Sequence, residues 1–132
     1  MTPTDTQHQI RRARCRLVAA RVRAAIWAMA DPQDMGALLT EIRAGMVELD
    51  IPLLYCGVNI VDMTSAEPSV ITHSMNPKGD WKRLQSRGSM VVLEFWRQKD
   101  VVYRRDLSRD DPYGESIIFP GVGCIIDVPF PQ

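Results

Sequence analysis

Hydrophobic positions recur at helical spacing through the first part of the chain. From His8 to Ala30 the sequence contains neither Gly nor Pro and is rich in Ala and Arg, which favours a helix. Residues 1–7 are polar, and we expect them to be frayed. Within the helix, six residues follow a 3-4-3-4-3 spacing that is typical of a short coiled-coil seam, and we call them the heptad stripe: Ile10, Ala13, Leu17, Ala20, Ala24 and Trp27.

Further apolar residues widen this face of the helix: Val18, Val22, Ala25 and Met29. A helix with so wide an apolar face has to bury it, either on the domain that follows or on a second copy of the chain. Small residues are frequent in the seam, and the break at Asp31-Pro32 separates the helix from the next element. We therefore favour a homodimer formed through a separate helical segment, residues 1–32.

A second helix is predicted over residues 34–49, with Asp31 or Asp34 as its N-cap. Its apolar residues fall on one face, namely Met35, Leu38, Leu39, Ile42, Met46 and Leu49. This face predicts a core between the second helix and whatever follows it.

The period of the apolar residues changes to two after residue 50, which indicates strands. In the segment 53–62, Cys56 and Val58 should face the second helix, while Tyr55 and Asn59 face the other way. The segment 69–75, "SVITHSM", alternates again and fits a hairpin partner.

The second half of the chain is less regular. The pattern predicts a loop with a short helical piece over 76–88, a segment at 89–98 that fits both helix and strand, a strand at 101–107 and a polar loop at 108–115. A last apolar strand is expected at 121–130, with Cys124 and Ile126 on one face and Asp127 on the other. The order of elements predicts an α+β domain built around an antiparallel sheet.

Several motifs in this order resemble a GAF domain of bacterial signalling proteins, of the kind found in sensor histidine kinases and two-component systems. They are "LDIPLLYCGVNIVD", "FWRQKDVVYRRDL", "DDPYGE" and "CIIDVPF". In that family a helix that ends in a W-R turn precedes a short strand that ends in D-L, so the resemblance implies that 89–98 is helical. It also implies that residues 33–132 are a GAF-like domain with flanking helices.

A GAF domain continues beyond the "DVPF" strand with further strands and a closing helix, so the resemblance implies that this domain is incomplete at its C-terminus. An unfinished sheet has an unpaired edge, which favours self-association. None of the three cysteines lies in the sequence context that attaches a bilin in the photoreceptor branch of the family.

Composition narrows the functional classes. In 132 residues, 16 Lys and Arg balance 16 Asp and Glu, so we expect one domain and no nucleic-acid partner. Six arginines in residues 1–30, against Asp5 alone, fit either a charged outer helix face or an anionic partner surface. No signal peptide or membrane span is expected, and three widely spaced cysteines fit a reducing cytoplasm.

The sequence offers no combination of nucleophile, base and orienting group that catalysis would need, so we expect no enzymatic activity. Cys56 as a nucleophile would need a base such as His73, yet its alternation places it on the apolar face, where burial disfavours the thiolate. Cys124 is expected on a similar buried face. The two histidines, His8 and His73, cannot complete a zinc site with these cysteines, so no metal is predicted.

The resemblance implies a ligand site on the side of the sheet away from the helix at 34–49, where GAF domains bind cyclic nucleotides or other small molecules. Alternation places mixed aromatic and polar groups on that side, which suit such a pocket. Turn capping by Asn59 and Asp127 and core packing by Tyr103 and Trp96 are the alternatives. The candidate ligand-binding residues are Tyr55, Asn59, His73, Trp96, Tyr103, Arg105 and Asp127.

The sequence therefore predicts a cytoplasmic GAF-like sensor or regulatory module of a signal-transduction protein, which binds a small molecule, dimerises, or both. A dimerisation scaffold without a ligand is the alternative. The identity of any ligand or cofactor does not follow from the sequence.

Overall fold

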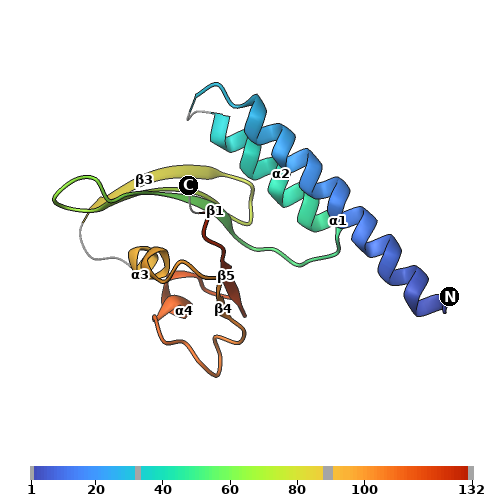
Figure 1. Cartoon of the computed structure of the whole chain (residues 1–132). Helices are drawn as coiled ribbons and strands as arrows, with labels where there is room; N and C mark the ends of the chain where they lie inside the picture. Colours follow the sequence, from blue (N-terminus) through green and yellow to red (C-terminus); the bar gives the residue numbers. More distant parts are fainter. Residues whose placement is uncertain (1, 32–33, 88–90, 131–132) are drawn as a thin grey trace. The chain divides into compact units, whose positions relative to one another are not determined.

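The computed structural model of the chain describes residues 2–31, 34–87 and 91–130. These residues form an α+β structure, as predicted, in which strands β1, β2 and β3 make one antiparallel sheet and β4 and β5 make a second (Figure 1). The elements are α1 Pro3–Ala28, α2 Met35–Glu48, β1 Cys56–Asp62, β2 Ser69–Met75, β3 Trp81–Arg87, α3 Val91–Gln98, β4 Val102–Arg104, α4 Glu115–Ile118 and β5 Ile125–Asp127.

The first helix begins earlier than the sequence indicated, because it has a strong N-terminal cap. The Thr2 hydroxyl accepts a hydrogen bond from the backbone N–H of Asp5, and the Asp5 carboxylate accepts one from the backbone N–H of Thr2. Pro3 occupies the first turn, where its fixed φ suits a helix. The expectation that residues 1–7 fray is therefore wrong for the described residues 3–7.

The cap of the second helix also differs from the prediction. Asp34 is the N-cap of α2, yet its side chain does not bond to the first turn of that helix. Its carboxylate instead accepts hydrogen bonds from the backbone N–H groups of Ala30 and Asp31, at 2.7 and 3.2 Å. These bonds lower the pKa of Asp34 and fix the end of the chain that leaves α1.

Two expectations about the strands are wrong. Residues 81–87 form β3 rather than a loop, and the strands form two sheets rather than one. β3 is last in the order β1-β2-β3, so it is an edge strand, and its exposed Lys82 and Arg83 are typical of such an edge. Those charges hide the alternation on which a strand prediction depends. The predicted helix at 89–98 is confirmed over Val91–Gln98.

The chain divides into two compact units. Unit 1 comprises Met1–Val58 and His73–Arg83, and unit 2 comprises Asn59–Thr72 and Leu84–Gln132. The boundaries fall inside β1, β2 and β3, so each of these strands contributes residues to both units. The division into residues 1–32 and 33–132 stays a prediction.

Unit 1 has an apolar core between α2 and the strands, as the helical pattern predicted. Its buried residues are Met35, Leu38, Leu39 and Met75, and the partly buried residues packed against them are Val22, Ala25, Met29, Ile42, Cys56 and Val58. Helices α1 and α2 lie side by side, and the N-terminal part of α1 runs on past the end of α2 (Figure 1).

Close contact between the two helices depends on Gly45 of α2. A Cβ atom at this position would overlap the side chain of Val18 on α1. The backbone of α2 can therefore approach α1 closely only because residue 45 has no side chain.

Candidate functional site

Helix α1 has two apolar faces that differ in exposure. The face with Val18, Val22, Ala25 and Met29 is half-buried, and all but Val18 pack on the core of unit 1, with Val18 against Gly45 of α2. The heptad stripe is exposed along its whole length, and the exposed fractions of Ile10, Leu17 and Trp27 are 55%, 67% and 86%. The sequence had not distinguished the two faces, and the structure leaves the heptad stripe without a partner among the described residues.

Ion pairs with α2 and with Asp50, which follows it, line one edge of the heptad stripe. Arg21 bonds to the carboxylate of Glu48 and lies 3.3 Å from that of Glu41. Arg14 donates to the backbone carbonyl of Glu48 and lies 4.0 Å from the carboxylate of Asp50. The bond with Arg21 lowers the pKa of Glu48 and raises that of Arg21. These contacts fix the rotation of α1 about its own axis, with the stripe turned to solvent.

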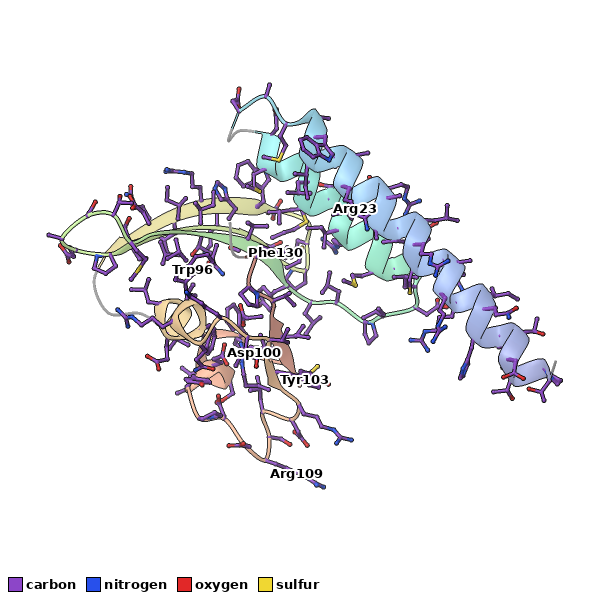
Figure 2. The ribbon with its side chains drawn as sticks, in the orientation of Figure 1. Arg23, Trp96, Asp100, Tyr103, Arg109 and Phe130 are labelled. Atoms are coloured by element: carbon purple, nitrogen blue, oxygen red, sulfur yellow. The ribbon has the colours of Figure 1, made fainter. Side chains whose placement is uncertain are left out.

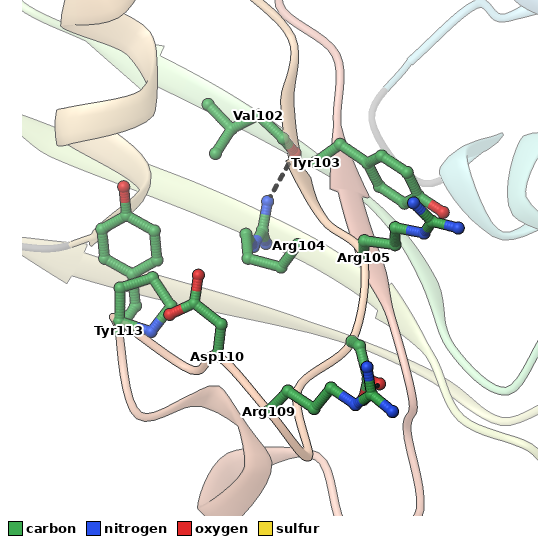
Figure 3. Close-up of a pocket in the computed structure, with 9 residues that line it drawn as sticks. Val102, Tyr103, Arg104, Arg105, Arg109, Asp110 and Tyr113 are labelled. Carbon is green, nitrogen blue, oxygen red and sulfur yellow. Dashed lines mark hydrogen bonds and ion pairs between the residues drawn. The ribbon is translucent and has the colours of Figure 1, made fainter.

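A pocket of about 330 Å³ lies within unit 2, between β4 and the turns that follow it (Figure 3). In Figure 3 the side chains of Arg105 and Arg109 lie on one side of the view, and those of Asp110 and Tyr113 lie on the other. The lining residues are Val102, Tyr103, Arg104, Arg105, Asp106, Arg109, Asp110, Pro112 and Tyr113.

A buried arginine forms the base of this pocket. Arg104 is 5% exposed and makes a bidentate pair with Glu115, with Nε–Oε1 and Nη2–Oε2 distances of 2.7 and 2.8 Å. Its Nη2 also lies 2.6 Å from Oδ2 of Asp127, and its Nη1 donates to the Val102 carbonyl. Burial alone would lower the pKa of Arg104, but the bonds and charges of the two carboxylates outweigh it and raise the pKa. Arg104 is therefore a fixed cation.

Aromatic rings complete the support for Arg104. Its guanidinium carbon lies 4.6 Å from the centroid of the Phe95 ring, and the Tyr113 ring meets Phe95 edge-on at 4.9 Å. The "DPYGE" sequence places Tyr113 and Glu115 because Asp111 caps the turn, accepting from the backbone N–H groups of Glu115 and Ser116. A bond from the Ser116 hydroxyl contributes most to lowering the pKa of Asp111.

The rim of the pocket carries exposed charges of both signs. Arg105, Arg109 and Asp110 are all exposed, and Nε of Arg109 lies 3.6 Å from Oδ2 of Asp106. Asp106 also accepts hydrogen bonds from the backbone and hydroxyl of Ser108, which orders the turn. Two exposed guanidinium groups beside two tyrosine rings can hold an anionic group and stack on a planar one.

The structure brings together two of the predicted ligand residues, Tyr103 and Arg105, at this pocket. Asp127 lies elsewhere, because the β4–β5 register pairs it with Val102 and pairs Tyr103 with Ile126. Asp127 thus shares a face with Arg104, to which it is bound, and lies on the opposite face of this small sheet from Tyr103. The expectation of one common face is wrong for this pair.

His73 is also on the other face from the one predicted. In β2 it alternates with Thr72 and shares its face with Met75, which belongs to the core beside α2. The His73 ring lies 5.9 Å from the Trp81 ring, and that indole covers Gly36 of α2, where a Cβ would overlap it. His73 is 1% exposed, and its Nδ1 has no hydrogen-bond partner in the described part of the chain.

The remaining predicted ligand residues are not gathered at one site. The Asn59 side-chain oxygen accepts a hydrogen bond of 2.7 Å from the Thr72 hydroxyl of the neighbouring strand. In β1, Asn59 points to the opposite face from Cys56 and Val58, as predicted. Tyr55, just before β1, and Trp96, in α3, are half-buried (Trp96 is labelled in Figure 2). A ligand-binding role for any of these residues stays a prediction.

The cysteines divide in a way that the sequence predicted only in part. Cys56 is half-buried with its Sγ 3.8 Å from the Leu39 carbonyl, and burial raises the pKa of its thiol. Cys124 is exposed, so its expected burial is wrong, and Cys15 is exposed as well. Across residues 2–31, 34–87 and 91–130, no three His, Cys, Asp or Glu side chains are grouped to hold a metal ion.

A scan against protein-family models finds no match to the chain, and neither do searches of curated proteins and of solved structures. The GAF resemblance therefore stays a prediction. In the described part of the chain, no helix combines the length and apolar character that crossing a membrane requires.

Sequence reasoning missed the residues that build the pocket, above all Arg104, Glu115 and Tyr113. The available signal in the sequence was the basic segment "RRD" followed, after a short turn, by the acidic segment "DDPYGE". Nothing in that pairing tells which of the two adjacent arginines is buried.

Proposed function

We propose that this chain is a regulatory module, GAF-like in its organisation, that self-associates through the heptad stripe of α1. The observation that carries the proposal is the exposure of the stripe while the other apolar face of the same helix is packed. Apolar residues at a and d spacing are the side chains that a coiled coil buries between helices. Signalling by a parent protein and a cytoplasmic location belong to the same proposal.

The molar mass in solution, measured by light scattering after gel filtration, tests self-association. We expect the wild type to have twice the mass of the chain and Leu17→Glu to be monomeric, because a charge at the centre of the stripe opposes its burial. Ile117→Glu is the matched control, since Ile117 is 86% exposed in unit 2 and outside the stripe. A wild type that stays monomeric at every concentration contradicts the proposal.

Point substitution is preferable to removal of the helix. Val22, Ala25 and Met29 of α1 pack on the core of unit 1, so a chain without residues 1–30 would lose part of its core as well as the stripe. Loss of the dimer in such a chain would not distinguish the two causes.

A second candidate function, binding of a small molecule, is favoured by the pocket at Tyr103, Arg105 and Arg109. The arginines suit an anionic group and the tyrosine rings suit a planar one, a combination that cyclic nucleotides offer. The buried pair of Arg104 and Glu115 holds the base of the pocket in place before a ligand arrives.

Thermal unfolding in the presence of cyclic AMP or cyclic GMP tests this second function. We expect a saturable rise in Tm that Arg105→Met removes, since binding to the folded state alone stabilises it. Arg97→Met is the control, because Arg97 is an exposed arginine of α3 that does not line the pocket. An equal rise in Arg105→Met would place the binding elsewhere, and no rise with either nucleotide would leave the self-associating scaffold as the function.

A further inference from the structure

The two edges of the heptad stripe carry opposite charge. In heptad terms, Arg16 and Arg23 precede the a positions Leu17 and Ala24, so they occupy g positions. Both are exposed, and neither forms an ion pair with any described residue (Arg23 is labelled in Figure 2). This g edge therefore has uncompensated positive charge.

The other edge of the stripe has a net negative charge, although its e positions 14 and 21 are also arginines. Arg14 and Arg21 are held by three carboxylates, Glu41, Glu48 and Asp50. Arg21 and its two carboxylates, Glu41 and Glu48, leave the middle of this e edge with an excess of one negative charge. The carboxylates remain within reach of a partner, because the side chains of Glu41 and Glu48 are 35% and 53% exposed.

The orientation of two paired helices decides which edges meet. In a parallel pair related by a two-fold axis, the g edge of each helix faces the e edge of the other. In an antiparallel pair, g faces g and e faces e. In the parallel arrangement a g residue faces the e residue five positions later on the partner, so Arg16 of each copy faces Arg21 and its two carboxylates. The antiparallel arrangement opposes arginine to arginine.

We infer that the heptad stripe takes a second copy of this chain in parallel orientation, with Arg16 of the g edge paired with the Glu41–Arg21–Glu48 cluster across the interface. The inference rests on the self-association proposed above and adds its partner, orientation and register. The alanines of the stripe, Ala13, Ala20 and Ala24, let the two backbones approach closely, which brings the charged edges together. Helix α2 supplies the specificity, because its carboxylates give the e edge its sign.

Disulfide cross-linking tests the orientation directly. Two variants, Ala13→Cys and Ala24→Cys, are made in a Cys15→Ser/Cys124→Ser background, and one of them is labelled with ¹⁵N. In a parallel pair each engineered cysteine meets its own counterpart, while residues 13 and 24 are about 16 Å apart along the helix. In an antiparallel pair centred on the stripe, residue 13 of one copy meets residue 24 of the other.

After air oxidation of an equal mixture, we expect same-variant disulfides to outnumber mixed ones by about tenfold in mass spectra. The background protein, which retains the half-buried Cys56, must give no cross-link. Mixed disulfides in excess overturn the parallel orientation while the dimer itself stands. A dimeric mass without any cross-link moves the interface away from the stripe and also overturns the inference, and a monomeric mass refutes the self-association on which it rests.

Charge reversal gives an independent readout. Arg16→Glu/Arg23→Glu should raise the dimer dissociation constant about tenfold or more at low salt, because the glutamate at position 16 then faces the acidic e edge. In an antiparallel pair the same change replaces arginine opposite arginine by glutamate opposite glutamate, and the constant would stay the same. Arg12→Glu, at the exposed c position, is the control for net charge. An unchanged constant in the double variant overturns the charge pairing.

Discussion

The two units of this chain are stabilised by different interactions. Unit 1 is held by an apolar core in which Leu39 is fully buried, with Met35, Leu38 and Met75 around it. Unit 2 has buried apolar residues as well, but at its centre lies Arg104, a buried cation that two carboxylates compensate. The comparison shows that an apolar core can be found from the periodicity of the sequence, whereas a buried ion pair cannot, because the sequence does not tell which of two adjacent arginines is buried.

The largest effect is expected in unit 2. Arg104→Met should reduce the free energy of unfolding by about 3–5 kcal/mol, because Glu115 would remain buried without its cation. Urea unfolding followed by circular dichroism measures this change. Arg105→Met is the matched control and should stay within about 0.5 kcal/mol, since Arg105 is exposed. Equal effects of the two substitutions would contradict the assignment of the buried arginine.

The corresponding change in unit 1 is Leu39→Ala. It leaves a cavity in the apolar core and should reduce the free energy of unfolding by about 3 kcal/mol. Val47→Ala on the same helix is the control, because Val47 is 67% exposed and should change little. If the control lost as much stability as Leu39→Ala, α2 would not bury the face described here.

A smaller effect on stability is expected at the contact between α1 and α2, and its sign depends on the side chain at position 18. Gly45→Ala should destabilise by about 1 kcal/mol, because the overlap with Val18 exceeds the gain in helix propensity. In a Val18→Ala background the overlap is removed, and the same substitution should stabilise instead. Denaturant unfolding of the four proteins of this cycle measures the reversal, and a change of the same sign in both backgrounds would rule out the close approach.

The smallest effect concerns pH and His73. Burial, assisted by the charge of Arg83, lowers the pKa of His73 in the folded chain. The stability that the neutral imidazole contributes is therefore complete above its ordinary pKa of about 6.5 and is lost as pH falls through the lower folded value. Unfolding curves between pH 7.5 and 5 should show this loss in the wild type and a flatter profile in His73→Gln. Parallel profiles for the two proteins would exclude His73 as the cause.

The sequence predicted the parts of the fold that have a regular apolar period. Helix α2 and strand β2 lie where the pattern indicated, and helix α3 lies where the resemblance implied a helix. Cys56 packs against the core, as its alternation with Tyr55 predicted. Strand β3 was not predicted, because an edge strand tolerates charges at nearly every position and the apolar alternation is then lost. The face of His73 was also predicted wrongly, because period two gives relative faces but no absolute direction for a strand.

Only some of the residues that line the pocket could be predicted from the sequence. Tyr103 and Arg105 were chosen from alternation and line it, but Arg104 was not, although it lies between them. Adjacent arginines are equivalent in sequence, and only the β4–β5 register and the Asp111 cap decide which one meets Glu115. The heptad stripe was predicted from its spacing, but its exposure is visible only in the structure, in which the neighbouring face of α1 is packed and this one is open to solvent.

The environment of Trp27 reports directly on whether self-association buries the heptad stripe. Trp27 is 86% exposed at the end of the stripe. With fluorotryptophan incorporated, its ¹⁹F resonance, assigned by Trp27→Phe, can be followed against protein concentration in H₂O and D₂O. We expect the solvent isotope shift of this resonance to shrink as the dimer forms, while those of Trp81 and Trp96 do not change. A Trp27 resonance that stays fully solvent-sensitive while the molar mass doubles would contradict this expectation.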